Sequence, residues 1–175
     1  MIDQDQKRTM IIAIGGISNA GKSRLAARIA DFYKNQSAIV LCQDNYANPT
    51  PEIPKINSHT NWEIPESIDF DKYYKKILEC IPRYNIIIAE GLFVFYEQRL
   101  IDLYDKSIYL IIDKETFLER KKDDLRWGKE AEWYMEHIWD SHFKYCNEVV
   151  SRKKAYQLSG KEPIDFDAVV QFLEA

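Results

Sequence analysis

The stretch Gly16-Ile17-Ser18-Asn19-Ala20-Gly21-Lys22-Ser23 decides the fold of this chain. It fits the pattern GxxxxGK[ST] in full, and it follows the short apolar run at residues 10–14, which is typical of a buried parallel strand. Over residues 22–33 the apolar side chains recur at helical spacing. Strand, glycine loop and helix therefore follow one another in the order that a phosphate-binding loop requires.

The residue types in this loop suit the triphosphate of ATP. Glycines let successive backbone N–H groups turn toward phosphate oxygens, and the start of the following helix adds the positive end of its dipole. Lys22 is expected to reach the β- and γ-phosphates, the Ser23 hydroxyl to ligate Mg²⁺, and Arg24 to contact the nucleotide. The alternative, a glycine-rich turn with an accidental lysine, is disfavoured because the motif and its context agree.

The rest of the chain alternates between strand and helix patterns. Apolar runs predict further buried strands, with a last short strand near the end, at residues 38–42, 85–91, 107–113 and 156–158. Helical patterns lie at residues 68–80, 114–124, 130–152 and 165–173. This order predicts an α/β fold, a P-loop NTPase three-layer sandwich with a mainly parallel central sheet and a helical lid. We expect one domain over residues 1–175.

The bulk composition excludes several classes of partner. The 175 residues have a formal net charge of -4, so the positive surface that binds nucleic acid is not expected. No apolar run approaches the length of a membrane span, and the three widely spaced cysteines suit neither a zinc site nor a disulfide framework. The sequence predicts a cytoplasmic protein with reduced cysteines and a small-molecule substrate.

Two carboxylates follow the predicted strands. Asp44 comes just after the strand at residues 38–42, and Glu90 ends the apolar run at residues 85–91. Ligands of open α/β sheets bind outside the carboxyl ends of the strands, so both side chains are expected in the crevice that holds the phosphate loop. A general base and a partner for Mg²⁺ are the two roles open there. A turn residue for Asp44, and a cap or ion pair for Glu90, are the alternatives.

Three segments together give a family resemblance. The glycine loop, then Gln43-Asp44-Asn45-Tyr46, then Ile88-Ala89-Glu90-Gly91 resemble the uridine kinase and nicotinamide riboside kinase group of P-loop nucleoside kinases. The segment Asn61-Trp62-Glu63-Ile64-Pro65 is more similar to the nicotinamide riboside kinases, because an aromatic-acid pair follows a proline-containing loop there. The resemblance implies a nucleoside substrate.

The resemblance also implies roles for individual residues. Asp44 would accept the proton of the ribose 5'-hydroxyl and, with Ser23 and Glu90, partner Mg²⁺. Trp62 would stack on the nucleoside base, and Glu63 would accept hydrogen bonds from the ribose 2'- and 3'-hydroxyls. The implied substrate loop spans about residues 46–66 and continues from Asp44 and Asn45 through Tyr46 and Ala47. A core tryptophan and a solvated glutamate are the alternatives for Trp62 and Glu63.

The resemblance is weaker in the implied lid, at about residues 119–135. Arg120 would contact phosphate, Lys121 stands where the family has a substrate-contacting arginine, and Asp123-Asp124 interrupts the positive run. Lysine cannot make the planar two-pronged contact of arginine. Arg126 and Trp127 would follow as nucleotide and substrate contacts, and Ser159, Gly160 and Lys161 would lie near the adenine. A solvated charged helix face is the alternative for the lid residues.

These features predict an ATP-dependent kinase for the 5'-hydroxyl of a riboside, with nicotinamide riboside as the first choice of acceptor. A uridine or cytidine kinase is the nearest alternative. A protein that binds ATP as a switch and transfers nothing is a second alternative of a different class. The sequence leaves a monomer and a homodimer open.

Overall fold

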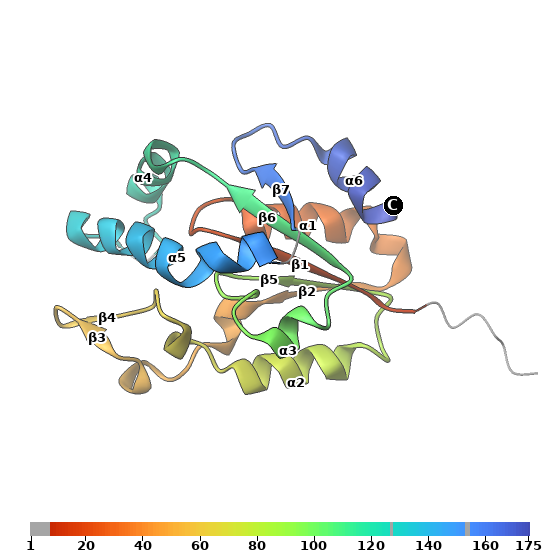
Figure 1. The fold of residues 1–175 in the computed structure, drawn as a ribbon, viewed down its shortest axis with the longest axis horizontal. Coiled ribbons are helices and arrows are strands. Elements are labelled where there is room, and N and C mark those ends of the chain that lie inside the picture. Colours follow the sequence, from red (N-terminus) through yellow and green to blue (C-terminus); the bar gives the residue numbers. More distant parts are fainter. Residues whose placement is uncertain (1–7, 127, 153–154) are drawn as a thin grey trace, which may run out of the picture.

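Five parallel strands form the centre of the molecule in the computed structural model, which describes residues 8–126, 128–152 and 155–175. The sheet order is β2-β5-β1-β6-β7 (Figure 1). The strands are β1 (Met10–Gly16), β2 (Ala38–Cys42), β5 (Ile86–Glu90), β6 (Lys106–Ile111) and β7 (Tyr156–Ser159). Every neighbouring pair is parallel, so the expected mainly parallel sheet is confirmed.

Helices cover both faces of this sheet. The longer helices are α1 (Lys22–Phe32), α2 (Phe70–Cys80), α4 (Lys114–Asp123), α5 (Glu132–Arg152) and α6 (Phe166–Glu174). Alternate residues of β1 point to opposite faces, as the pleat requires. Ile12 and Ile14 join a core with α1 and α6, whereas Ile11 and Ala13 join a second core with α2. Two cores on one sheet make the three-layer sandwich (Figure 1).

The helix boundaries follow from capping chemistry. Asp69 caps α2 by accepting a hydrogen bond from the backbone N–H of Lys72 at 2.9 Å, and Asp113 and Asp165 cap α4 and α6 in the same way. The sequence placed the start of α2 at residue 68, two residues early, because Ile68 continues the apolar pattern. Ile68 instead pairs with Ala47 in an isolated antiparallel bridge.

Two parts of the chain differ from the sequence-based expectations. A short helix, α3 (Gln98–Ile101), lies in a segment for which no helix was predicted, and its four residues are too few for a periodic pattern. The substrate loop implied over about residues 46–66 contains the small antiparallel hairpin of β3 (Lys55–Ile56) and β4 (His59–Thr60), with a 3₁₀ turn before it, Thr50–Glu52.

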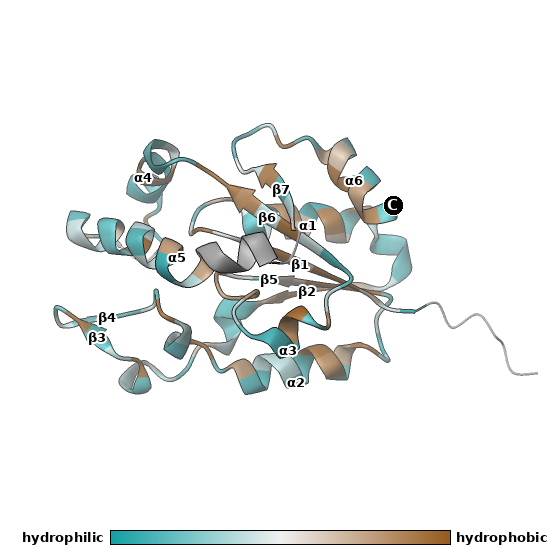
Figure 2. Cartoon of the chain, in the orientation of Figure 1, coloured by the Kyte–Doolittle hydropathy of each residue, from teal (hydrophilic) through white to brown (hydrophobic). Residues whose placement is uncertain are grey.

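From the sequence, a core position is favoured over a dimer surface for the aromatic side of residues 130–152, and the structure agrees only in part. Ile138 and Cys146 are buried, but Trp133 and Phe143 are 40% and 44% exposed. Val149 and Val150, placed on the same side, lie outside the residues whose side chains are described. Figure 2 shows that the central strands are hydrophobic, whereas α4 and the β3–β4 hairpin are largely hydrophilic.

Candidate active site

The phosphate loop lies at the carboxyl end of β1, between the strand and α1. Gly16 and Gly21 adopt positive φ angles of 142° and 98°, and Asn19 adopts 61°, so the backbone turns through conformations that glycine tolerates best. A Cβ on Gly16 would lie 2.6 Å from the carbonyl oxygen of Leu110. Gly21 is the N-cap of α1 and has no side chain to satisfy the first N–H groups, which an anion can therefore bind.

Lys22 and Ser23 begin α1 and contact different partners. The Lys22 ammonium donates to the carbonyl oxygen of Ile17 at 2.9 Å, across its own loop. The Ser23 hydroxyl donates to Oε1 of Glu90 at 2.9 Å, although 67 residues separate the two in sequence. The contact brings the predicted pair of Ser23 and Glu90 together.

The sheet register explains why these groups meet. Glu90 is the last residue of β5 and aligns with Ile14 of β1 and with Cys42 of β2. Glu90 is 2% exposed, while Asp44 follows β2 in a 3₁₀ turn and is exposed. Burial and then a hydrogen bond to Glu90 raise the pKa of the Cys42 thiol to about 12. Both predicted carboxylates therefore lie at the carboxyl ends of strands, and Glu90 contacts Ser23 of the phosphate loop.

Glu63 also belongs to this group of charges. Burial raises the pKa of its carboxyl to about 7, against the lowering influence of Lys121 and Lys22, and the neighbouring Asp44 and Glu130 raise it further. Glu63 is half-buried, and its contact with the sugar hydroxyls stays a prediction.

Trp62 precedes Glu63 and is 38% exposed. A core tryptophan is therefore the wrong interpretation, and its surface is accessible to a planar ligand. The other residues of the predicted substrate loop have different contacts. The ring of Tyr46 packs on Tyr73 of α2, with centroids 5.0 Å apart, and Ala47 pairs with Ile68. Asn45 is exposed.

Arg120 connects the phosphate loop to the last strand. Its guanidinium donates to the carbonyl oxygens of Asn19 and Gly160, both at 3.0 Å. A Cβ on Gly160 would lie 2.4 Å from the carbonyl oxygen of Ala20, so the two loops touch. Arg120 and Gly160 are thus both found beside the phosphate loop.

The acidic residue that interrupts the lid's positive run has a defined partner. Asp124 accepts a hydrogen bond from the side-chain amide of Asn19 at 3.0 Å. It also accepts two hydrogen bonds from the guanidinium of Arg126, at 2.7 and 2.6 Å. The Arg126 guanidinium beside Asp124, with a smaller contribution from Asn19, holds the pKa of that carboxyl well below its usual range. Asp124 therefore fastens the end of α4 to the phosphate loop.

Three further predicted residues are engaged in ion pairs. Lys121 is 7% exposed and lies 3.7 Å from Glu130. Arg24 pairs with Glu162 at 3.1 Å on the outer side of α1, and Lys161 pairs with Asp113. The Ser159 hydroxyl accepts from the backbone N–H of Lys161 at 3.2 Å. Trp127, predicted as a substrate contact, lies outside the described residues.

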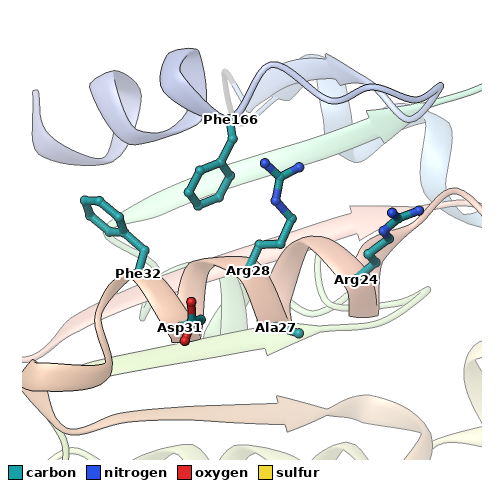
Figure 3. A pocket seen from close by; sticks show the side chains of 6 residues that line it. All are labelled: Arg24, Ala27, Arg28, Asp31, Phe32 and Phe166. Carbon is teal, nitrogen blue, oxygen red and sulfur yellow. The ribbon is translucent and has the colours of Figure 1, made fainter.

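A surface hollow of about 420 Å³ lies beside Arg24 (Figure 3). Residues of α1 and Phe166 of α6 line it, and the guanidinium of Arg28 lies 4.4 Å from the centre of the Phe166 ring. The hollow is therefore on the outer side of α1, whereas Ser23 of the same helix faces Glu90.

The side-chain oxygen atoms of Ser23 and Glu90 are of the type that Mg²⁺ binds. Mg²⁺ prefers oxygen ligands and is commonly held by one or two protein groups together with substrate phosphates and water. Among the described residues there is no cluster of three histidine, cysteine or acidic side chains that could hold a metal by itself. The Ser23 hydroxyl with the Glu90 carboxylate is consistent with an ion that arrives with its nucleotide.

Comparison with known proteins gives relatives of one kind. No family model matches the chain. Human nicotinamide riboside kinase 1 is 25% identical over 159 residues, which cover 81% of this chain and 79% of that protein. Uridine kinase of Saccharomyces cerevisiae is 28% identical over 139 residues, 63% of this chain but only 28% of the longer yeast protein. The chain is thus similar in sequence to nucleoside kinases.

This relationship confirms the resemblance seen in the sequence and the expected enzyme class, a phosphotransferase that acts on a hydroxyl group. The fold agrees. Shikimate kinase from Acinetobacter baumannii superposes with a TM-score of 0.63 at 16% identity, over 96% of this chain and 93% of that one. A possible uridine kinase from Bacillus stearothermophilus gives 0.58 at 13% identity, over 86% and 89%. The P-loop kinase fold is thereby confirmed.

Several residues near the site were not predicted from the sequence. Glu130 lies 3.7 Å from Lys121, and Asn61 Oδ1 accepts from the backbone N–H of Glu63 at 3.2 Å. Asp124 accepts from Asn19, which is 105 residues away. No motif in the sequence indicated these contacts. In the part of the chain that the structure describes, no helix is long and apolar enough to cross a membrane.

Proposed function

We propose that this protein is an ATP-dependent nucleoside kinase that phosphorylates the 5'-hydroxyl of a riboside, with nicotinamide riboside as the first candidate. One observation carries the proposal: the Ser23 hydroxyl of the phosphate loop donates to Glu90 at the end of β5 at 2.9 Å. This contact joins the phosphate loop to the carboxyl edge of the sheet, where the ligands of parallel sheets bind. The similarity to human nicotinamide riboside kinase 1 over most of both chains supports this choice of acceptor.

The donor half binds ATP in this proposal. The loop Gly16–Ser23 surrounds the phosphates with backbone N–H groups, and Lys22 exchanges the Ile17 carbonyl for a phosphate oxygen. Arg120 and Arg126 offset the negative charge of the transferred group, and Ser159, Gly160 and Lys161 lie toward the base. Mg²⁺, held by Ser23 and Glu90, would neutralise phosphate charge when bound with the nucleotide.

The acceptor half orients the sugar for attack. Trp62 stacks on the base, and Glu63 accepts hydrogen bonds from the 2'- and 3'-hydroxyls. Asp44 takes the proton of the 5'-hydroxyl as its oxygen bonds to the γ-phosphorus, while the bond from that phosphorus to the bridging oxygen breaks and ADP leaves. Most of the rate enhancement then comes from position and charge.

Two segments of the chain are assigned to acceptor binding and to closure of the site. We assign residues 46–66 to the acceptor loop and residues 119–135 to a lid, within one kinase domain. Closure of the lid would exclude water that could otherwise take the phosphoryl group. The link from Arg120 to Asn19 gives the lid a contact with the phosphate loop that can tighten around ATP.

Uridine or cytidine is the second candidate acceptor, because uridine kinases of several organisms are among the relatives. We would measure ADP release with Mg²⁺ and ATP against nicotinamide riboside, uridine, cytidine and pantothenate, and identify the product by mass. The largest rate is expected with nicotinamide riboside. ATP binding without any acceptor-dependent ADP release would contradict a kinase and favour the ATP-binding switch.

A further inference from the structure

The acceptor segment Thr60–Glu63 is fastened to α5. It begins with the last residue of β4, and its own loop gives it limited support. The Asn61 N–H donates to the Pro54 carbonyl at 2.9 Å, and the Ser67 hydroxyl donates to the Trp62 carbonyl at 3.0 Å. Two side chains of α5, Tyr134 and His137, add contacts from more than 70 residues away.

Tyr134 holds the backbone on both sides of Asn61. Its hydroxyl accepts from the N–H of Trp62 and donates to the carbonyl oxygen of Thr60, both at 3.3 Å. The residue is 2% exposed, and the ring of His59 packs on its ring with centroids 4.0 Å apart. A buried hydroxyl that serves two backbone groups of one segment restricts that segment more than a side-chain contact would.

His137 holds the side chain of Asn61. Its Nε2 lies 2.9 Å from the amide oxygen of Asn61. The same oxygen accepts from the backbone N–H of Glu63 at 3.2 Å, so the histidine nitrogen is the donor. The ring is oriented further by the hydroxyl of Ser141, 3.4 Å from Nδ1. One bridge, His137 to Asn61 to Glu63, thus connects the helix to the backbone of the residue expected to bind the sugar.

Tyr134 and His137 lie on one face of α5, because they are three positions apart. The same helix region touches α4, through the ion pair of Lys114 and Glu136 at 2.5 Å, and Lys121 of α4 pairs with Glu130 just before α5. α5 therefore contacts both the acceptor segment and α4.

We propose that Tyr134 and His137 are positioning residues, which fix the Asn61–Glu63 backbone so that Trp62 and Glu63 are presented to the acceptor. This inference rests on the proposed function for its kinetic consequence. Neither residue touches reacting atoms, so their loss changes acceptor binding and leaves ATP binding and the chemical step in place.

The test compares Tyr134→Phe and His137→Ala with the wild-type protein. Each variant is expected to raise the KM for the riboside by about five- to tenfold, the effect of losing one or two hydrogen bonds. The KM for ATP and kcat should stay within about twofold, because the donor half keeps its contacts. His137→Gln retains a side-chain donor and should recover part of the loss.

Tyr156→Phe is the matched control, since it removes the same hydroxyl from a tyrosine of β7 that stacks on Phe172. Hydrogen exchange at the Trp62 amide supplies a readout without activity: it should accelerate in Tyr134→Phe and not in Tyr156→Phe. Unchanged exchange, or equal rises in the KM for riboside and for ATP, would overturn the proposal. If the wild-type protein phosphorylates no riboside, the proposed function fails. The exchange rate of the Trp62 amide then tests by itself whether Tyr134 holds the acceptor segment.

Discussion

The phosphate loop and the acceptor loop are built in different ways. The phosphate loop is one continuous run, Gly16–Ser23, whose shape comes from its own glycines and from the strand and helix that flank it. The acceptor segment Thr60–Glu63 has little regular structure of its own and takes its position from α5. A local motif makes the donor half, and long-range packing makes the acceptor half.

Because the two loops are held in place differently, substitutions elsewhere in the molecule should affect them differently. A loop fixed by its own backbone tolerates change elsewhere in the molecule, whereas a segment held by a distant helix responds to substitutions that never touch the ligand. Variants in the donor half should therefore affect every acceptor equally. Variants in the acceptor half should discriminate among acceptors.

Replacement of Asp44 by asparagine should give the largest effect on turnover. Asn keeps the size of the side chain but cannot take the proton of the acceptor hydroxyl, so kcat should fall by about 10²- to 10⁴-fold. The affinity for ATP, measured by calorimetry, should change little. Turnover equal to that of the wild type would show that Asp44 is not the general base for the acceptor hydroxyl. It would also show that Asp44 does not link the donor half and the acceptor half of the site.

Removal of the Lys22 ammonium should affect the donor half alone. Lys22→Ala loses charge-assisted contacts to phosphate, and kcat/KM for ATP should fall by about 10- to 100-fold. Steady-state kinetics with two different ribosides provides the control, because the loss should be the same for both. A loss that depends on the riboside would break the separation between the two halves.

The acceptor half should respond to pH through Glu63. Burial raises the pKa of its carboxyl to about 7, so it gains its charge as the pH rises through neutrality. The charged form accepts hydrogen bonds from two sugar hydroxyls, and the KM for the riboside should therefore fall by about tenfold between pH 6 and pH 8.

Glu63→Gln is the control for this pH dependence, which it should abolish. A higher pH should also lower the stability of the protein. The pKa of Glu63 is higher in the folded state than in the unfolded state, so the folded state binds more protons at pH values between the two pKa values. The free energy of unfolding should then fall as the pH rises from the unfolded pKa toward 7. A pH profile of KM that persists in Glu63→Gln would assign the titration to another group.

The smallest effect is expected at the link between the lid and the phosphate loop. Asp124→Asn removes the charge that holds Arg126 and weakens the contact with Asn19. Arg126 would be free to contact phosphate, and the KM for ATP should fall by about two- to fivefold. Glu119→Gln, a change of one exposed lid carboxylate, is a suitable control, and a rise in the KM for ATP with Asp124→Asn would refute this role.

The sequence predicted the regular part of the fold well. The strands at residues 38–42 and 85–91 and the helix after the phosphate loop agree with the structure to within one residue or so, because apolar runs and capping residues are local signals. It missed α3, whose four residues are too short for a periodic pattern. It favoured the core over a dimer surface for the aromatic side of α5, whereas Trp133 and Phe143 are 40% and 44% exposed.

By itself the sequence determined the phosphate loop, because a strand, a glycine-rich turn and a helix start specify their own geometry through backbone torsions and local hydrogen bonds. Only the tertiary structure decided that Ser23 bonds Glu90, that Asp124 reaches Asn19, and that Tyr134 and His137 hold the acceptor segment. These contacts join residues 67 to 105 positions apart. The packing of helices on a shared sheet sets such distances, and no local pattern of residue types encodes them.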